Sequence, residues 1–267
     1  MHSPASPDLG TLLEALLPAV REAGRFIEAV KAKGVIEQVK ADDSPVTEAD
    51  RGAEDILRAA ILAVDPDAVI VGEEGVADGD IPAPTARFWL LDPLDGTRDF
   101  VAGREAYTVN AGLVVDGAPA LGLVLHPPTG KLWAGGPGLG AWVEPRDGPR
   151  AAIASRPLAR PPVLMLSHSH LDPETQAWSD AVPGAIAQSA GSSIKFCRLA
   201  AGAADAYPRF GPTSEWDTAA ADAVLRGAGG TTLAAGGEPF RYGKPGYRNG
   251  PFLALGDPAA ATLLPRF

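Results

Sequence analysis

The sequence predicts an α/β protein in which sheets and helices are stacked in layers. Apolar residues at helical spacing, short apolar strands and turn signals alternate along the whole 267-residue chain. Apolar residues make up 46% and charged residues 21% of the chain, a balance that is typical of a globular protein and excludes disorder as its main state. A chain of this length forms one large domain or two closely packed ones.

Two helices are expected near the N-terminus. Apolar side chains recur at helical spacing over residues 8–31, with a kink or restart at Pro18, which lacks the amide hydrogen that a helix needs. A short strand is expected at residues 35–39. Thr47 and Asp50 then form a T-x-x-D capping signal, which predicts the start of a second helix.

Strands dominate the middle of the chain. Apolar runs at residues 68–71 and 88–91 suit buried strands, and acidic residues follow each run. Turn signals, Asp-Gly at 116–117 and Pro-Pro-Thr-Gly at 127–130, then separate the strands of a meander. The strands of this meander are expected at residues 107–115, 121–125, 131–135 and 141–144.

A turn-rich segment at residues 146–149 marks the predicted boundary between an N-terminal half, residues 1–148, and a C-terminal half, residues 149–267. Strands and helices alternate beyond this boundary, which is typical of an α/β chain. They are expected at residues 163–166, 173–181, 186–190, 194–201, 204–208, 218–227, 231–234 and 252–255.

Charge and cysteine content exclude several classes of function. The 33 acidic and 23 basic residues give a net charge of −10 without a basic stripe, so a nucleic-acid polymer is not an expected partner. Cys197 is the only cysteine, which excludes an intramolecular disulfide and a thiolate metal cluster. No apolar run reaches the about 18 to 20 residues of a membrane span, and the first basic residue after Met1 is Arg21, too late for a signal peptide. These features predict a soluble cytoplasmic protein.

The strongest local signal is the string LDPLDGT at residues 91–97. Asp92 and Asp95 stand three residues apart at the end of an apolar strand, which Pro93 is expected to terminate. Each aspartate alone could satisfy the amides of a turn. The whole string, near other acidic strand ends, instead favours a functional loop.

Gly96 and Thr97 add a phosphate site beside these carboxylates. Gly96 permits a tight backbone, and the two amides form an anion site where Thr97 opens a helical turn. Carboxylates repel a phosphate unless a cation lies between them, and oxygen ligands of this kind favour Mg2+. Two such ions about 4 Å apart would clamp a phosphoryl transfer.

Other acidic residues have structural explanations when each is taken alone. Glu73 and Glu74 form a solvated pair, Asp217 caps a helix, and Asp50 complements a helix dipole. Their sequence context is more specific than these explanations. The motifs that contain them are SPVTEAD at 44–50, GEE at 72–74, DPLDGT at 92–97 and WDTAA at 216–220, the last running on to AGG at 228–230.

In this order the motifs resemble those of the lithium-sensitive, Mg2+-dependent phosphatases that include inositol monophosphatases and 3′(2′),5′-bisphosphate nucleotidases. The resemblance implies an αβαβα layered sandwich of the inositol monophosphatase and sugar phosphatase type, with the active site between the two halves. It also implies two or three Mg2+ ions. Glu73, Asp92 and the Leu94 carbonyl would bind the first ion, and Asp92, Asp95 and Asp217 the second.

The resemblance further implies how water and substrate are held. Thr97, hydrogen-bonded to Asp50, would orient the attacking water, and Glu73 would help to deprotonate it. A metal-bound water has a lowered pKa, and the second ion stabilises the leaving alkoxide. The substrate-binding set is Glu73, Leu94, Asp95, Gly96, Thr97, Ser192, Lys195, Arg209 and Asp217.

The bisphosphate nucleotidases are the subgroup that the C-terminal half resembles most. The matching strings are SHLD at 169–172, GSSIKFC at 191–197, GAADAYPR at 202–209 and GPT at 211–213. Lys195 and Arg209 suit a second phosphate, because a desolvated phosphate needs charged donors; surface salt bridging is the alternative explanation for these two cations. The expected reaction is hydrolysis of adenosine 3′,5′-bisphosphate to AMP and phosphate, which in this family clears a by-product of sulfate assimilation.

Two other functions stay open from the sequence. Inositol monophosphatase is the alternative within the enzyme class, ahead of sugar bisphosphatase and histidinol phosphatase. A non-catalytic scaffold that binds a nucleotide or an ion is the other, although every metal and water-orienting position is present. The resemblance also implies a monomer or a homodimer, and bacterial members of this type can associate peripherally with the inner membrane.

Overall fold

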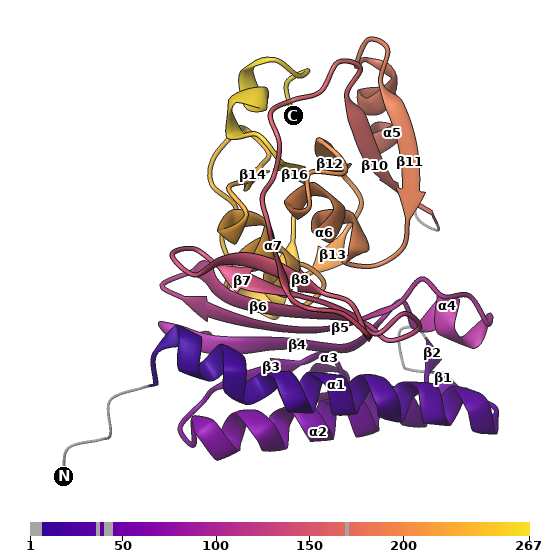
Figure 1. Cartoon of the computed structure of the whole chain (residues 1–267), viewed down its shortest axis with the longest axis vertical. Helices are drawn as coiled ribbons and strands as arrows, with labels where there is room; N and C mark the ends of the chain where they lie inside the picture. The colour runs from indigo at the N-terminus through magenta and orange to yellow at the C-terminus, as the bar shows by residue number, and fades with distance from the viewer. Residues whose placement is uncertain (1–6, 36–37, 40–44, 169–170) are drawn as a thin grey trace.

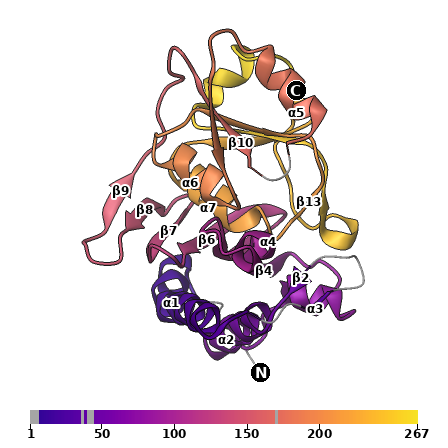
Figure 2. The ribbon, with the colours of Figure 1, turned by 90° about the vertical axis from the view of Figure 1, so that its right-hand side faces the viewer.

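The computed structural model describes residues 7–35, 38–39, 45–168 and 171–267 of the chain. Five layers follow one another along the molecule (Figures 1 and 2): two helices, a seven-stranded sheet, two further helices, a five-stranded sheet and outer helices. The αβαβα order implied by the resemblance is therefore confirmed. Ser44, the first residue of one motif, lies outside the described residues, as do Ser169 and His170 of the SHLD string.

The first layer consists of α1 (Leu9–Lys33) and α2 (Glu48–Val64), which lie side by side under the first sheet. α1 begins after Asp8, which caps it, and continues as one helix through Pro18. No restart occurs at Pro18, because the apolar residues on both sides of it are buried in one continuous core with α2 and the sheet. The strand expected at residues 35–39 is described only as β1 (Gln38–Val39), which pairs with β2 (Pro45–Val46); residues 36–37 lie outside the described part.

The seven-stranded sheet has the order β3-β4-β5-β6-β7-β8-β9. β3 and β4 are parallel and every later pair is antiparallel, which confirms the predicted meander. Trp89 and Leu91 of β4 pack towards α1 and α2, whereas Phe88 and Leu90 pack towards the second sheet. The strands are β3 (Ile70–Gly72), β4 (Arg87–Asp95), β5 (Thr108–Val115), β6 (Ala118–His126), β7 (Lys131–Gly136), β8 (Gly140–Glu144) and β9 (Ala151–Ile153).

The expectation that Pro93 ends its strand is wrong. β4 pairs with β5 at Asp92 and again at Asp95, and the register shifts between these two positions. This irregularity takes Pro93 out of the ladder, so its missing N–H interrupts no strand pairing. The strand therefore carries both aspartates, and the shift turns their loop out of the regular sheet.

The second half contains a mixed sheet in the order β11-β10-β12-β16-β14. α6 and α7 fill the space between the two sheets, and α5 with a short 3-10 helix (Pro258–Thr262) covers the outer face. α7 approaches β6 so closely that a Cβ on Gly122 would lie 1.8 Å from the Ala220 carbonyl oxygen. The elements are β10 (Val163–Ser167), α5 (Pro173–Asp180), β11 (Ile186–Ala190), α6 (Ile194–Ala200), β12 (Ala206–Arg209), α7 (Ala219–Gly227), β14 (Thr231–Ala234) and β16 (Phe252–Leu255).

Several short elements were not expected from the sequence, and they surround the site described below. They are α3 (Glu73–Ala77), β13 (Thr213–Ser214), a 3-10 turn (Pro245–Tyr247) and β15 (Arg248–Asn249). The first sheet ends at β9 and the second begins at β10. The division into residues 1–148 and 149–267 stays a prediction.

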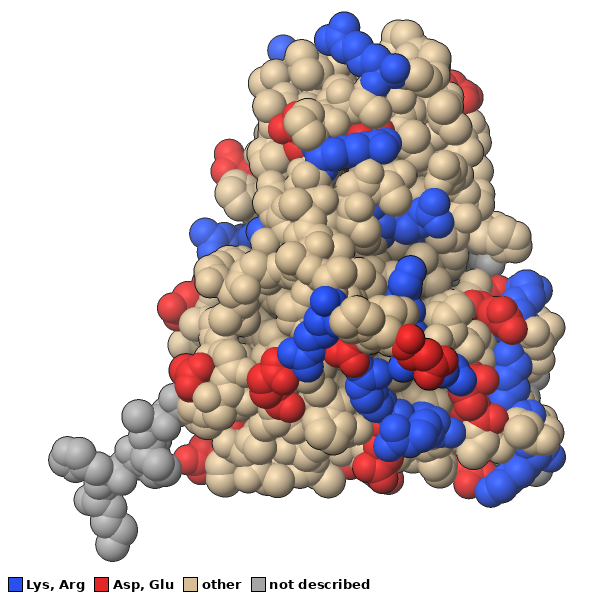
Figure 3. Space-filling view, in the orientation of Figure 1, with Lys and Arg blue, Asp and Glu red and all other residues tan. Residues whose placement is uncertain are grey.

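Charged side chains are concentrated over the N-terminal helices and the first sheet on the face shown in Figure 3, where both signs are interspersed. Ion pairs of this kind join α1 to β8, because Arg150 contacts both Glu14 and Glu144. In the described part of the chain, no helix is both long and apolar enough to cross a membrane.

Candidate active site

A cavity of about 430 Å3 opens where the edges of the two sheets meet α3, the start of α6 and the segment before α7. Nine of the eleven predicted site residues line it. They are Glu73, Asp92, Leu94, Asp95, Gly96, Thr97, Ser192, Lys195 and Asp217. Arg209 lines an adjoining cavity of about 260 Å3, and Asp50 is buried behind Thr97. The fold thus brings residues from both halves of the chain to one place.

The loop after Asp92 has the backbone form that the sequence predicts. The Leu94 amide donates to Asp92 Oδ1 over 3.1 Å, which holds the loop against the strand. Gly96 adopts a left-handed conformation with φ +103°, and a Cβ there would lie 2.6 Å from the Ala106 carbonyl oxygen. α4 (Thr97–Val101) begins immediately afterwards, which confirms the helical turn at Thr97.

Thr97 and Asp50 form the expected hydrogen bond. Thr97 Oγ1 lies 2.8 Å from Asp50 Oδ1 and 3.0 Å from the Leu94 carbonyl oxygen. Asp50 Oδ2 accepts from the amide and the hydroxyl of Thr47, both at 2.7 Å, within the capping box that starts α2. Burial raises the pKa of Asp50 above its ordinary value, although these hydrogen bonds act to lower it. The capping residue of one helix thus positions a hydroxyl at the cavity.

Glu73 is the first residue of α3 and lines the cavity. The buried carboxylate of Glu54, on α2, holds this corner by accepting from the amides of Glu74 at 2.9 Å and Gly75 at 3.2 Å. Glu74 is itself buried, so a solvated pair does not describe these two glutamates. Sequence reasoning missed Glu54; its one signal is an acidic residue four places after Asp50 on an otherwise apolar helix face.

Asp217 precedes α7 but does not cap it. Thr218 occupies the N-cap position, and Asp217 Oδ2 accepts from the Ser214 amide at 2.8 Å. Burial, followed by repulsion from Asp95 and Glu73, raises the pKa of Asp217 well above its ordinary value. Burial also raises the pKa of Asp95 to about 6, with repulsion from Glu73 adding to it and Lys195 opposing it.

These carboxylates fit a divalent cation by their chemistry. They offer oxygen ligands only, and they repel one another inside a cavity where carboxylates outnumber the cationic side chains. Within the described residues, however, no three Asp, Glu, His or Cys side chains already converge as a preformed ion site. The assignment of individual ligands to two ions therefore stays a prediction.

Lys195 and Arg209 are both buried, which excludes surface salt bridging as their role. Lys195 Nζ donates to the carbonyl oxygens of Ser192 at 2.7 Å and Ala190 at 3.3 Å. Burial lowers the pKa of Lys195 to about 8, with attraction to Asp95 opposing it. Arg209 donates to Ser167 Oγ at 2.7 Å and to two carbonyl oxygens of residues 211–212.

Ser192 combines two unusual features at the cavity wall. Its φ of +47° lies in the left-handed region, which serine rarely adopts. Its hydroxyl oxygen is buried, and it has no hydrogen-bond partner among the residues that the structure describes. Both features suit a residue that is held ready for a ligand. Sequence reasoning missed other residues that line the same cavity, namely Arg98, Asp99 and Arg248.

Comparison with known proteins agrees with this geometry. The model of the inositol monophosphatase family matches residues 8–263, nearly the whole chain. The chain belongs to the inositol monophosphatase family. This membership confirms the resemblance that the four motifs indicated, and metal-dependent phosphatase chemistry is general in the family.

Several named relatives are bisphosphate nucleotidases, and another relative, the "Histidinol-phosphatase" of Chlorobaculum parvum, is 34% identical over 72% of this chain and 73% of its own length. The "3'(2'),5'-bisphosphate nucleotidase CysQ" of Escherichia coli O157:H7 is 38% identical over 233 residues, 86% of this chain and 94% of that protein. The protein of the same name from Salmonella typhimurium is 39% identical over 220 residues, 82% of this chain and 88% of its own length. The crystal structure of CysQ from Bacteroides thetaiotaomicron is 31% identical, with a TM-score of 0.76 over 92% of this chain and 97% of that chain.

Proposed function

We propose that this protein is a Mg2+-dependent 3′(2′),5′-bisphosphate nucleotidase that hydrolyses adenosine 3′,5′-bisphosphate to AMP and phosphate. The observation that carries the proposal is the Thr97–Asp50 hydrogen bond at a cavity lined by Asp92, Asp95 and Asp217. It provides a positioned hydroxyl beside carboxylates that suit a cation. The relatives named CysQ, at 38–39% identity, support the nucleotide as substrate.

The residues of the cavity divide the reaction between them. The carboxylates of Glu73, Asp92, Asp95 and Asp217 with the Leu94 carbonyl would hold Mg2+, which would lower the pKa of the attacking water and offset the charge of the leaving oxygen. The Thr97 hydroxyl donates a hydrogen bond to Asp50 or to the Leu94 carbonyl. Its oxygen can therefore accept a hydrogen bond from the attacking water and orient this water. Glu73 accepts the proton of this water. The amides of Gly96 and Thr97 hold the reacting phosphate.

The cofactor and the setting of the enzyme belong to the same proposal. We expect two or three Mg2+ ions per chain, a monomer or a homodimer, and inhibition by lithium. A cytoplasmic location agrees with a single cysteine that is free and buried. Clearance of a by-product of sulfate assimilation is the proposed cellular role, and peripheral attachment to the inner membrane is tested by cell fractionation.

The test is phosphate release from adenosine 3′,5′-bisphosphate and from inositol 1-phosphate, side by side, with Mg2+ and with excess chelator. We expect a large preference for the nucleotide that disappears with chelator and returns when Mg2+ is restored. A preference for inositol phosphate would keep the metal chemistry and overturn the nucleotidase. Absence of metal-dependent turnover on every phosphate ester, in a protein that binds Mg2+, would instead indicate a binding scaffold.

A further inference from the structure

Arg248 places a charged side chain at the active-site cavity that no sequence motif indicated. It belongs to β15, which pairs antiparallel with β13, so that Arg248 lies opposite Ser214. Its side chain is exposed, and it lines the same cavity as Thr97 and Asp217. In the described part of the chain, its guanidinium makes one hydrogen bond, from Nη1 to Ser214 Oγ at 3.0 Å. A guanidinium has five N–H donors, so most of its capacity faces the cavity and solvent.

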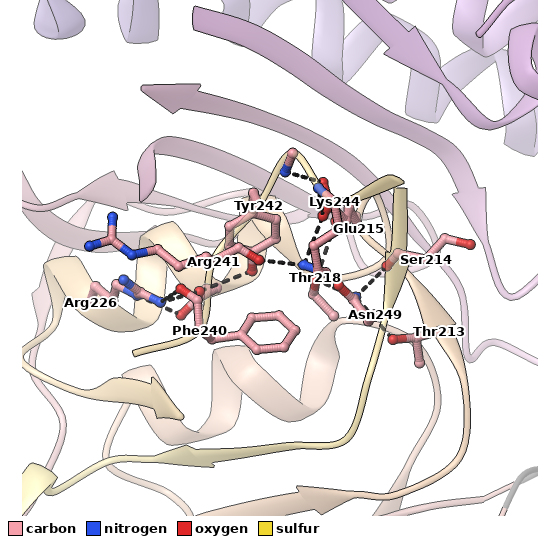
Figure 4. Close-up of polar contacts among 12 residues, drawn as sticks. Thr213, Ser214, Glu215, Thr218, Arg226, Phe240, Arg241, Tyr242, Lys244 and Asn249 are labelled. Carbon is pink, nitrogen blue, oxygen red and sulfur yellow. Dashed lines mark hydrogen bonds and ion pairs between the residues drawn. The ribbon is translucent and has the colours of Figure 1, made fainter. Parts of the chain in front are cut away.

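The segment that carries Arg248 is firmly attached to the catalytic part of the chain. We call residues 240–249 the strap. The buried Asn249 donates from Nδ2 to the Ser214 carbonyl at 2.7 Å and to Thr218 Oγ1 at 3.1 Å. Figure 4 shows Asn249 between Thr213, Ser214 and Thr218, and Lys244 of the strap against Glu215. The residues on either side of Asp217 therefore fix the backbone of Arg248, and its side chain extends from this fixed backbone to the cavity.

A cation at this cavity suits the binding of a second phosphate. It is lined by carboxylates, among them Glu73, Asp92, Asp95 and Asp217. A substrate with a second phosphate brings about 1.5 to 2 further negative charges into the cavity, and donors with positive charge form the strongest hydrogen bonds to such a phosphate. Lys195 is buried and its ammonium already donates to two carbonyl oxygens, whereas Arg248 is exposed at the cavity with one neutral partner. Guanidinium also matches phosphate geometry with paired N–H donors.

We propose that Arg248 is a substrate-binding residue that contacts the non-reacting phosphate of a nucleoside bisphosphate and selects for it over monophosphates. This inference rests on the proposed function. Because Arg248 contacts the phosphate that does not react, it acts on substrate binding rather than on the chemical step.

The experiment compares wild type, Arg248→Gln and Arg248→Lys, with Arg241→Gln as the matched control. Arg241 is an exposed arginine of the same strap that does not line the cavity. Initial rates are measured on adenosine 3′,5′-bisphosphate and on adenosine 3′-monophosphate, which also serves as a competitive inhibitor where its turnover is slow. Thermal unfolding of each variant checks that the fold is intact.

We expect Arg248→Gln to raise KM for the bisphosphate about 10-fold to 100-fold, because the variant loses a hydrogen bond between charged groups. The value of kcat should change less than about threefold. Binding of the monophosphate should change less than about twofold, Arg248→Lys should recover part of the loss, and Arg241→Gln should match wild type. Equal effects on both nucleotides, or none in a folded variant, would overturn the inference and leave the nucleotidase intact. A wild type that does not hydrolyse the bisphosphate would overturn the proposed function and this inference with it.

Discussion

Glu215 provides the sharpest test of how the strap is held. It is completely buried directly before Trp216 and Asp217. Its two carboxylate oxygens accept from the amides of Gly243 at 2.7 Å and Lys244 at 2.9 Å, and Lys244 Nζ lies 2.7 Å away (Figure 4). Replacement by alanine leaves both amides and the ammonium without this partner.

The magnitude follows from these three contacts. A hydrogen bond to a charged group contributes about 1.5 to 3 kcal/mol, so the two amide bonds account for about 3 to 6 kcal/mol. The ion pair adds at most about 1 kcal/mol, because the Lys244 side chain is 32% exposed and water screens the interaction. We therefore expect Glu215→Ala to lower the free energy of unfolding by about 4 kcal/mol. At about 2 to 4 °C per kcal/mol for a chain of this size, Tm should fall by roughly 10 °C.

The assay is urea denaturation at pH 7, followed by tryptophan fluorescence and by far-UV circular dichroism. Glu238→Ala is the control, because Glu238 is an exposed glutamate near the strap and should change stability by less than about 0.5 kcal/mol. Glu215→Gln should fall between wild type and Glu215→Ala, because it retains one acceptor oxygen. A loss below about 1 kcal/mol in Glu215→Ala would refute the reasoning that these contacts attach the strap.

Two further predictions concern catalysis and pH. Asp95→Asn should nearly abolish turnover without changing Tm by more than a few degrees, because it removes a charge from the carboxylate cluster rather than a core contact; wild-type turnover in the folded variant would contradict the role of Asp95. Burial acts to raise the pKa of Asp205, but hydrogen bonds from Arg156, Val163 and Ala159 outweigh it and hold this pKa below its ordinary value. The carboxylate therefore stabilises the fold above the unfolded aspartate pKa of about 4, and this contribution is lost as the pH falls through the lower folded value. Asp205→Asn should cost about 2 kcal/mol at pH 7, and urea titrations should show the difference from wild type shrinking below about pH 4; a difference that is constant down to pH 2 would exclude this linkage.

Much of the site was predictable because its residues are close together in the sequence. The Thr47–Asp50 capping box, the DPLDGT loop and the helical turn at Thr97 depend on backbone rules that act within a few residues. The same local reasoning failed at Pro93, because it considered β4 alone. The shift in the ladder with β5, which accommodates the proline, is a property of two strands.

Other features had no local signal. β13 and β15 contain two residues each, too few for a period, and they lie far apart in the chain. Glu54 and Arg248 act through this kind of distant contact: one holds the start of α3, and the other reaches the cavity from the strap. Arg248 is exposed whereas Lys195 is buried, and nothing in the local sequence around either residue indicates this difference.

The sequence by itself determined the layered α/β class, the order of the longer elements and most of the residues that line the cavity. Hydrophobic periodicity, capping and turn rules act over a few residues, so a string of letters displays them directly. Only the tertiary structure decided which charged side chains face the cavity and which are hydrogen-bonded to other groups inside the protein. Burial, repulsion among Asp95, Asp217 and Glu73, and the attachment of the strap all depend on distances between residues that the chain brings together only when it folds.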